Sequence, residues 1–319
     1  MSQLMKQGNR QESKGSPVRK GLIMTALVPG NANEFIEQQL DERIRWIEDY
    51  FNSDALSLAG PIFDGVDNLL RIAMEQMRAE SRRRRLTVVL TTKGGYIEVV
   101  RRIVDTMRTH YAIVDFVIPD YAYSAGTVLA LSGDSIHMDY YSRLGPIDPQ
   151  VETPSGKKWV PALGYLEQYN RLIKKAKDGT ITVAEVRLLI DGFDQAELYE
   201  YEQARELSIA LLKEWLVRYK FKNWKKTETR GITVTKQMRT ERAREIAEAL
   251  NDIEKWHVHG YGISKDVLHK DLNLKIDDFG GSPDLSGKIR GYYDLLRDYM
   301  IKRSCWGVIH TKYAYEPFM

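Results

Sequence analysis

The stretch Tyr-Ala-Tyr-Ser-Ala-Gly-Thr at residues 121–127 decides how this chain folds. It follows an apolar, β-branched run over residues 112–119 and opens a helix-compatible run that ends near Ser132. Another short strand is predicted over residues 135–138. A strand, a sharp turn of small residues and a helix together lift one side chain out of the sheet. Here that side chain is Ser124.

Two interpretations are open for Ser124. A serine at the start of a helix commonly acts as an N-cap, in which its hydroxyl accepts a backbone N–H. It can also be a nucleophile whose oxygen is presented beside backbone N–H groups that hold an oxyanion. The stretch by itself favours the cap, so the upstream sequence has to decide between the two.

The upstream sequence alternates between strand and helix patterns. Strands are predicted over residues 54–59 and 86–91, and helices over residues 33–51, from residue 64 and after Gly95. Strands that alternate with helices form parallel sheets with crossover connections. The sequence therefore predicts an α/β fold, a β-α-β core with a mostly parallel sheet and a helical C-terminal extension.

The chain divides into three expected parts. Residues 1–30 are polar and unpatterned, so we expect a disordered tail. Residues 31–160 carry the β-α-β pattern of the core. Residues 161–319 are dominated by long helical patterns, and we expect a helical extension that completes the fold and supplies an oligomer interface.

Two turns of this pattern belong together. Lys93-Gly-Gly95 follows one predicted strand, and the Ser124 turn follows the next. Successive parallel strands often lie side by side, so both turns should meet at the carboxyl edge of the sheet, where open α/β sheets place their sites. The backbone N–H groups of Gly95 and Ala125 could then hold the oxyanion of an acyl-transfer reaction together.

Composition and charge narrow the class of protein. The chain has 319 residues, 43% of them hydrophobic and 29% charged, as in a globular protein. The net charge of +3 gives no reason to expect a nucleic-acid partner, and the four arginines of residues 82–85 are predicted to be a solvated helix end.

Cys305 is the single cysteine, so no internal disulfide or thiolate zinc cluster is expected. Without an apolar span or a signal-peptide core, we expect a cytoplasmic protein.

Five motifs in order resemble a known family. They are Gly60-Pro-Ile62, Thr92-Lys-Gly-Gly95, Tyr123-Ser-Ala-Gly-Thr127, Gly133-Asp134 and the run from Ser142 to Gln150. Together they resemble the ClpP/crotonase-fold serine peptidases, and most closely the ClpP-class branch called serine dehydrogenase proteinases, which are relatives of the signal peptide peptidase SppA. The resemblance covers roughly residues 54 to 150 in motif detail.

The resemblance implies a function and a mechanism. Ser124 would be the nucleophile of a serine endopeptidase that cleaves peptide bonds through an acyl-enzyme, and Gly95 and Ala125 would form the oxyanion hole. The substrates would be peptides or unfolded proteins, and the protein would be a homo-oligomer that acts alone or with an ATPase or another partner. No cofactor or metal is implied. The sequence has no Gly-x-Gly-x-x-Gly fingerprint, so the family name does not indicate an oxidoreductase.

The general base is left open by the sequence. A ClpP-like histidine would be expected near Asp148, and none is there. SppA-like enzymes use a lysine from the helical region, which makes Lys174 or Lys175 a candidate, although a solvated basic helix face explains both. His259, two residues after His257, is a third candidate, although a hydrogen-bonded histidine explains it better, and the pair without a third ligand is only a weak sign of a metal site. A neighbouring subunit could also supply the base.

Two rival functions follow from the same pattern. The missing histidine would suit a non-catalytic scaffold in which Ser124 is only a helix cap. Acyl-CoA chemistry on the crotonase fold is the other rival, but it needs a carboxylate, and the helix after Ser124 offers no obvious one. Around the predicted site, Tyr96, Tyr121 and Tyr123 could line a peptide-binding groove or pack as ordinary tyrosines.

Overall fold

The computed structural model describes residues 30–147, 150–152, 159–256 and 260–318. The polar tail expected over residues 1–30 falls almost wholly outside this part of the chain.

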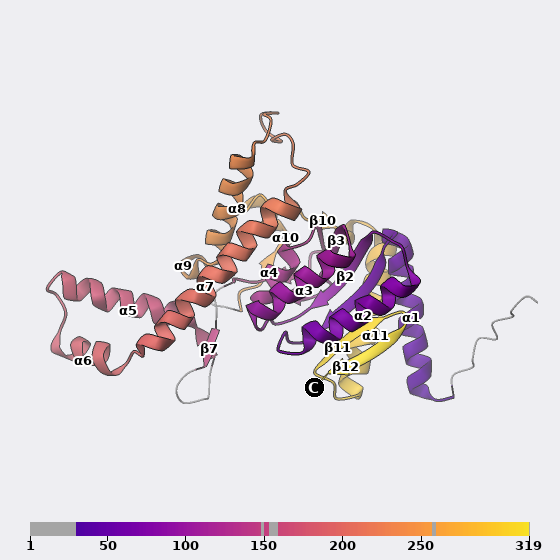
Figure 1. The fold of residues 1–319 in the computed structure, drawn as a ribbon, viewed down its shortest axis with the longest axis horizontal. Coiled ribbons are helices and arrows are strands. Elements are labelled where there is room, and N and C mark those ends of the chain that lie inside the picture. The colour runs from indigo at the N-terminus through magenta and orange to yellow at the C-terminus, as the bar shows by residue number, and fades with distance from the viewer. Residues whose placement is uncertain (1–29, 148–149, 153–158, 257–259, 319) are drawn as a thin grey trace, which may run out of the picture.

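A seven-stranded sheet forms the centre of the molecule (Figure 1). Its order is β10 (Asp277–Asp278), β5 (Ser135–Met138), β3 (Ile113–Val117), β2 (Arg85–Thr91), β1 (Asp54–Ala59), β11 (Gly307–Thr311) and β12 (Ala314–Phe318). The first five strands run parallel to their neighbours, while β11 and β12 run antiparallel. The predicted α/β fold with a mostly parallel sheet is confirmed.

Helices cover both faces of the sheet. On one face α2 (Val66–Glu80), α3 (Ile97–His110) and α4 (Ala125–Leu131) pack against side chains such as Val88, Leu90 and Phe116. On the other face α1 (Ala32–Phe51) and α11 (Pro283–Lys302) pack against Ala55, Val89 and their neighbours. Because both faces are covered, β1 and β2 are buried along nearly their whole length, as expected of a parallel sheet.

Smaller elements gather beyond the carboxyl ends of β3 and β5. A three-stranded sheet of β4 (Tyr121–Ala122), β6 (Arg143–Leu144) and β9 (Ile263–Ser264) ties the Ser124 turn to two later segments. A hairpin of β7 (Gln150–Glu152) and β8 (Trp159–Pro161) follows β6.

An arm projects from this body (Figure 1). It consists of α5 (Ala162–Lys177), α6 (Val183–Asp191) and the first half of α7 (Gln195–Trp215), around a small cluster of its own that includes Leu166 and Leu198. The second half of α7 continues as a π-helix (Leu216–Lys220) and packs on α3, α4 and α8 (Lys236–Leu250). The short elements α9 (Ile253–Trp256), α10 (Lys265–Lys270) and a 3₁₀ turn (Phe279–Gly281) complete the body.

The C-terminal segment corrects one expectation. Residues beyond 160 are not only helical, because β10, β11 and β12 enter the main sheet, and β11 pairs directly with β1. The strands are two to five residues long, too short for a periodic pattern to separate them from the helices around them. Among the described helices, none is both long enough and apolar enough to cross a membrane.

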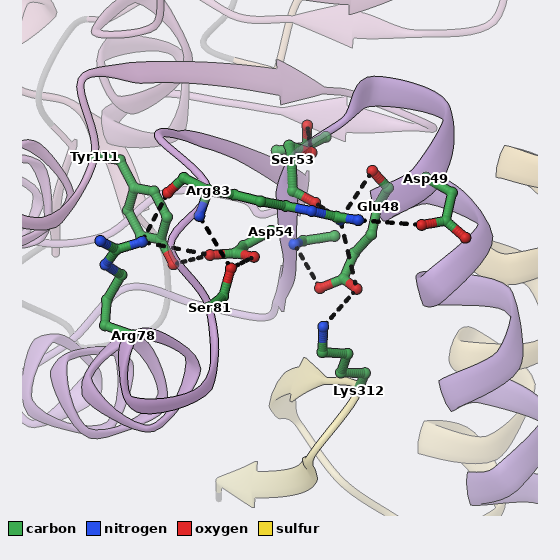
Figure 2. Close-up of polar contacts among 11 residues, drawn as sticks. Glu48, Asp49, Ser53, Asp54, Arg78, Ser81, Arg83, Tyr111 and Lys312 are labelled. Atoms are coloured by element: carbon green, nitrogen blue, oxygen red, sulfur yellow. Dashed lines mark hydrogen bonds and ion pairs between the residues drawn. The ribbon is translucent and has the colours of Figure 1, made fainter.

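A polar network closes the amino edge of the sheet, opposite the Ser124 turn (Figure 2). Asp54 at the start of β1 accepts hydrogen bonds from Ser81 (2.6 Å) and the Tyr111 hydroxyl (2.9 Å). Glu48 near the end of α1 accepts from the Ala55 N–H at 3.2 Å and pairs with Lys312 at 2.9 Å. These contacts join α1, α2, β1, the segment before β3 and the β11–β12 turn.

The predicted solvated helix end holds for only half of the arginine run. Arg82 and Arg84 are exposed, and Arg82 donates to the Arg78 carbonyl in the last turn of α2, but Arg83 and Arg85 contact other elements. The helix α2 already ends at Glu80, and Arg83 donates to the carbonyl of Glu48 in the last turn of α1 (3.2 Å) and to that of Ser53 just after it (2.5 Å). Arg85 pairs with the buried Asp115 at 2.5 Å. Arg83 therefore caps a different helix, and Arg85 neutralises a buried carboxylate. This role could not be predicted, because a single sequence does not show which distant backbone carbonyls an arginine will reach.

Candidate active site

Ser124 adopts a backbone conformation that side-chain-bearing residues rarely take. Its φ is 54° and its ψ is −124°, between the end of β4 and the first residue of α4. Such a conformation costs on the order of 1–3 kcal/mol and persists only where surrounding contacts enforce it. The Ser124 side chain makes no capping hydrogen bond to α4. The cap interpretation is therefore wrong, and the hydroxyl is presented on a strained turn.

Thr92 and Thr127 hold this turn on two sides. The Thr92 N–H donates to the Tyr121 carbonyl (3.1 Å), and the Thr92 carbonyl accepts from the Tyr123 N–H (2.9 Å). The buried Thr127 hydroxyl donates to the Ala122 carbonyl (2.7 Å) and accepts from the Gly145 N–H (2.9 Å). The sequence motifs contained both threonines without revealing this role. The sequence carried no signal of this role, because the burial of both threonines is seen only in the structure.

The glycine turn lies directly against Ser124. A Cβ on Gly94 would come within 2.9 Å of the Ser124 Cβ and within 2.8 Å of the Tyr123 carbonyl oxygen. A Cβ on Gly95 would overlap the Ile62 carbonyl oxygen at 1.8 Å. Both glycines also have positive φ, 101° and 149°. Only glycine allows these close approaches: Gly94 lies against Ser124 and the Ala125 N–H, while Gly95, the predicted oxyanion residue, follows it in the same loop and packs on Ile62.

The backbone donors around Ser124 are not equivalent. The Gly94 N–H is used within its own loop, because it donates to the Thr92 hydroxyl at 3.0 Å. In contrast, the N–H groups of Gly95 and Ala125 have no acceptor among the described residues. Unpaired N–H groups are rare where the backbone is buried, and Ala125 is only 6% exposed. Two free donors beside a presented serine oxygen are what a tetrahedral oxyanion requires.

Tyrosines surround the turn. Tyr121 and Tyr123 stack with their ring centroids 5.1 Å apart, and Gly145 leaves room for the Tyr123 ring, which a Cβ there would touch at 2.8 Å. Burial raises the pKa of both Tyr121 and Tyr123, so both hydroxyls stay protonated near neutral pH. Tyr96 beside the glycine turn is 54% exposed. These rings give the site an apolar surround.

The structure does not bring the candidate bases on the arm to Ser124 within one chain. Lys174 is exposed on α5, which packs on α6, α7 and the β7–β8 hairpin and projects away from α4 (Figure 1). Lys175 pairs with Glu185 at 2.5 Å, and this contact helps to lower the pKa of Glu185 to about 2. His257, His259 and Asp148 lie outside the described residues.

His137 has no part in this site. It lies on β5 with its ring against Phe51 of α1, at a centroid distance of 4.9 Å, so it is a packing residue. Within the part of the chain that the structure describes, no group of three or more His, Cys, Asp or Glu side chains could hold a metal ion.

Comparison with known proteins identifies the family. The parallel sheet with both turns at its carboxyl edge has the arrangement of a ClpP-like α/β protein. The family model of the ClpP-like SDH-type serine proteinases matches residues 61–236, and the chain belongs to this family. The match begins just before Ile62 of the first motif and includes both turns. The resemblance seen in the motifs is thus confirmed.

Two relatives and three solved structures are similar to the chain. Two uncharacterized proteins of Methanocaldococcus jannaschii are 30% identical over 121 residues and 29% identical over 147 residues, which are 38% and 42% of this chain. These matches span 39% and 48% of the relatives, less than half of their length.

The solved structures include two mutants of the 1510-N membrane-bound stomatin-specific protease, one of them in complex with a substrate peptide. The first is 12% identical with a TM-score of 0.41, and the match covers 70% of this chain and 77% of that one. The second, with the peptide, is 13% identical with a TM-score of 0.42, and the match covers 70% of this chain and 73% of that one. ClpP1 from Listeria monocytogenes is 12% identical, with a TM-score of 0.38, and covers 73% of this chain and 95% of its own.

Proposed function

We propose that this protein is a serine endopeptidase that cleaves peptide bonds of peptides or unfolded proteins through an acyl-enzyme on Ser124. The observation that carries the proposal is the strained Ser124, which does not cap its helix and lies against the glycine turn, where the N–H groups of Gly95 and Ala125 have no acceptor in the described part of the chain. Membership of the serine proteinase family supports the same reaction class.

The mechanism follows from this arrangement. The Ser124 oxygen attacks the peptide carbonyl carbon and transfers its proton to a base. The N–H groups of Gly95 and Ala125 stabilise the negative oxygen of the tetrahedral intermediate. The intermediate collapses when the leaving amine takes the proton, and water then hydrolyses the ester on Ser124.

We place the base on a second copy of the chain. The candidate Lys174 lies on an arm that projects away from its own Ser124 turn. The arm also carries α6, an apolar helix without a single buried residue, on which Val183 is 89% and Ile190 is 71% exposed. Burial of α6 against a neighbouring molecule would remove this apolar surface from water and desolvate nearby lysines, which lowers their pKa. A homo-oligomer therefore fits both needs.

Labelling with a fluorophosphonate tests the nucleophile. The purified full chain should react at Ser124, as mapped by peptide mass spectrometry, and Ser124→Ala should not react although it keeps its circular dichroism spectrum. A folded wild-type protein that remains unlabelled would favour the non-catalytic scaffold.

A mixing experiment tests where the base lies. Alanine variants of Lys174, Lys175, His257 and His259 are assayed one by one for peptide hydrolysis. The variant that loses activity is then mixed with Ser124→Ala under conditions that allow subunit exchange. A base in trans predicts that activity returns on mixing, because some sites then combine an intact serine with an intact base. A base within the same chain predicts no recovery.

A further inference from the structure

The helix α11 reaches two loops at the carboxyl edge of the sheet from the face opposite α4. Its buried side packs on the sheet through Leu285, Ile289, Tyr292 and Leu296. Arg290 and Tyr293 lie three residues apart on one flank of the helix, so their side chains reach in similar directions. Both contact a carboxylate in a loop that follows a strand of the parallel sheet.

Arg290 contacts the loop after β5. It pairs with Asp139, a fully buried carboxylate that also accepts the N–H groups of Tyr141 (2.9 Å) and Ser142 (3.1 Å). The Ser142 hydroxyl reaches the Ile118 carbonyl at the end of β3 at 2.5 Å. This contact fixes the loop after β5 against the segment that leads to Ser124.

Tyr293 contacts that leading segment itself. Its hydroxyl donates to Asp120 Oδ2 at 2.8 Å, and Asp120 lies four residues before Ser124. Tyr293 is only 7% exposed, and burial raises its pKa, so the hydroxyl keeps the proton that it donates. The backbone carbonyl of Asp120 also accepts the Arg143 N–H at 2.7 Å, which links it to β6.

We propose that Tyr293 is a positioning residue that holds the strained Ser124 turn in place through Asp120. The inference rests on the proposed function. A positive φ at a serine needs contacts that enforce it, and Thr92 and Thr127 supply them from the side of β2 and α4. The Tyr293–Asp120 contact supplies the third, from the opposite face of the sheet. Tyr293 touches no reacting atom.

A matched pair of variants tests this role. Tyr293→Phe removes the hydroxyl that holds Asp120. Tyr299→Phe is the control on the same helix, away from the Ser124 turn: the Tyr299 hydroxyl donates to Glu37 of α1 at 2.7 Å and accepts from Arg303 at 2.9 Å. If the role is positioning, kcat and the rate of fluorophosphonate labelling fall about tenfold in Tyr293→Phe with KM within about twofold, since small displacements of a nucleophile cost rate. Tyr299→Phe should keep the wild-type values at a similar loss of melting temperature.

Variants of Asp120, the acceptor of the Tyr293 hydroxyl, test the same contact from its other side. Asp120→Asn keeps an acceptor for the Tyr293 hydroxyl and should retain most of the rate, whereas Asp120→Ala should match Tyr293→Phe. The double variant of Asp120→Ala with Tyr293→Phe should lose no more than either single variant. Equal losses in Tyr293→Phe and Tyr299→Phe, or additive losses in the double variant, would overturn the proposal.

Hydrogen exchange separates this proposal from the proposed function. The amides of residues 119–127 should exchange faster in Tyr293→Phe than in the wild type, with no change in Tyr299→Phe. This readout needs no activity. Unchanged exchange rejects the positioning role even if Ser124 is labelled, while faster exchange in an unlabelled protein supports the role and rejects the peptidase.

Discussion

The two edges of the central sheet use polar groups in opposite ways. At the amino edge, Asp54, Glu48 and Arg83 each have several partners, and their contacts join helices and strands into one network (Figure 2). At the carboxyl edge, Ser124 is strained, and the N–H groups of Gly95 and Ala125 lack partners among the residues that the structure describes. Satisfied buried groups stabilise a fold, whereas strain and open donors cost stability and are useful only to a ligand or a transition state.

This difference predicts that substitutions at the two edges separate activity from stability. Changes at the carboxyl edge should alter the rate of the reaction more than the free energy of unfolding. Changes at the amino edge should do the reverse.

The largest effect is expected for Ser124→Ala. Loss of the nucleophile should reduce peptide hydrolysis by about a thousandfold or more. The free energy of unfolding should stay within about 0.5 kcal/mol, because the hydroxyl makes no capping bond and alanine keeps the same backbone strain. Hydrolysis of a fluorogenic peptide and urea unfolding measure the two quantities. A large loss of stability would show that the hydroxyl has a structural role after all.

Gly95→Ala is the exception to this separation and should lower both the rate and the stability, because the added Cβ also clashes with the backbone. The added Cβ would overlap the Ile62 carbonyl oxygen at 1.8 Å, so the loop has to move away from Ser124. We expect the rate to fall about a hundredfold from the displaced donor, with a loss of roughly 2–4 kcal/mol in the free energy of unfolding. Gly287→Ala on α11, where a Cβ meets nothing within 4 Å, is the matched control: it should leave the rate unchanged and raise the free energy of unfolding by about 0.5–1 kcal/mol, as alanine does inside a helix. Wild-type labelling in Gly95→Ala would argue against Gly95 as an oxyanion donor.

Asp54→Ala tests the amino edge. The substitution leaves Ser81 and Tyr111 without their buried acceptor and should cost roughly 3 kcal/mol of stability. At a temperature where the variant is folded, its kcat should match the wild type, because the network lies at the other end of the sheet. Asp298→Ala, in an exposed i,i+4 pair with Lys302, is the control and should cost less than about 0.5 kcal/mol. A reduced kcat in folded Asp54→Ala would contradict the separation of the two edges.

The titration of His137 should make the free energy of unfolding depend on pH. Burial lowers the pKa of His137 to about 4, from an ordinary value of 6.5, and the nearby positive charges of Lys220 and Arg85 act in the same direction against the attraction of Asp277. The unfolded chain therefore binds the proton more readily, so the stabilising contribution is complete above pH 6.5 and is lost as the pH falls to about 4. The lost contribution is about 3 kcal/mol at most.

Urea unfolding between pH 4 and 7 measures this effect. His137→Gln should flatten the curve in that range. The same slope in His137→Gln and in the wild type would assign the effect to other groups.

The sequence predicted the parts of the molecule that depend on local pattern. Strands such as β2 and helices such as α3 follow from runs and spacing, and Gly95 and Ser124 follow from turns placed after neighbouring strands. Contacts between distant segments left no such pattern. β11 enters the sheet beside β1 across about 250 residues, and Tyr293 reaches Asp120 from the last long helix. The φ of Ser124 is likewise set by its neighbours and could not be read from residue types.

The smallest effect is expected on stability when glycine replaces two residues with positive φ, one at each edge of the sheet. Asn52 ends α1 with φ 46° and ψ 52°, inside the left-handed region that asparagine tolerates, whereas Ser124 has a similar φ but a ψ of −124°. Replacement by glycine relieves backbone strain but adds about 0.4–1 kcal/mol of unfolded-chain entropy. Ser124→Gly should therefore raise stability by roughly 1 kcal/mol, and Asn52→Gly should change it by less than about 0.5 kcal/mol. Both values come from the midpoints of urea unfolding, with Ser124→Ala as the reference that keeps the strain. Equal changes in the two glycine variants would mean that the Ser124 turn stores no more strain than an ordinary helix end.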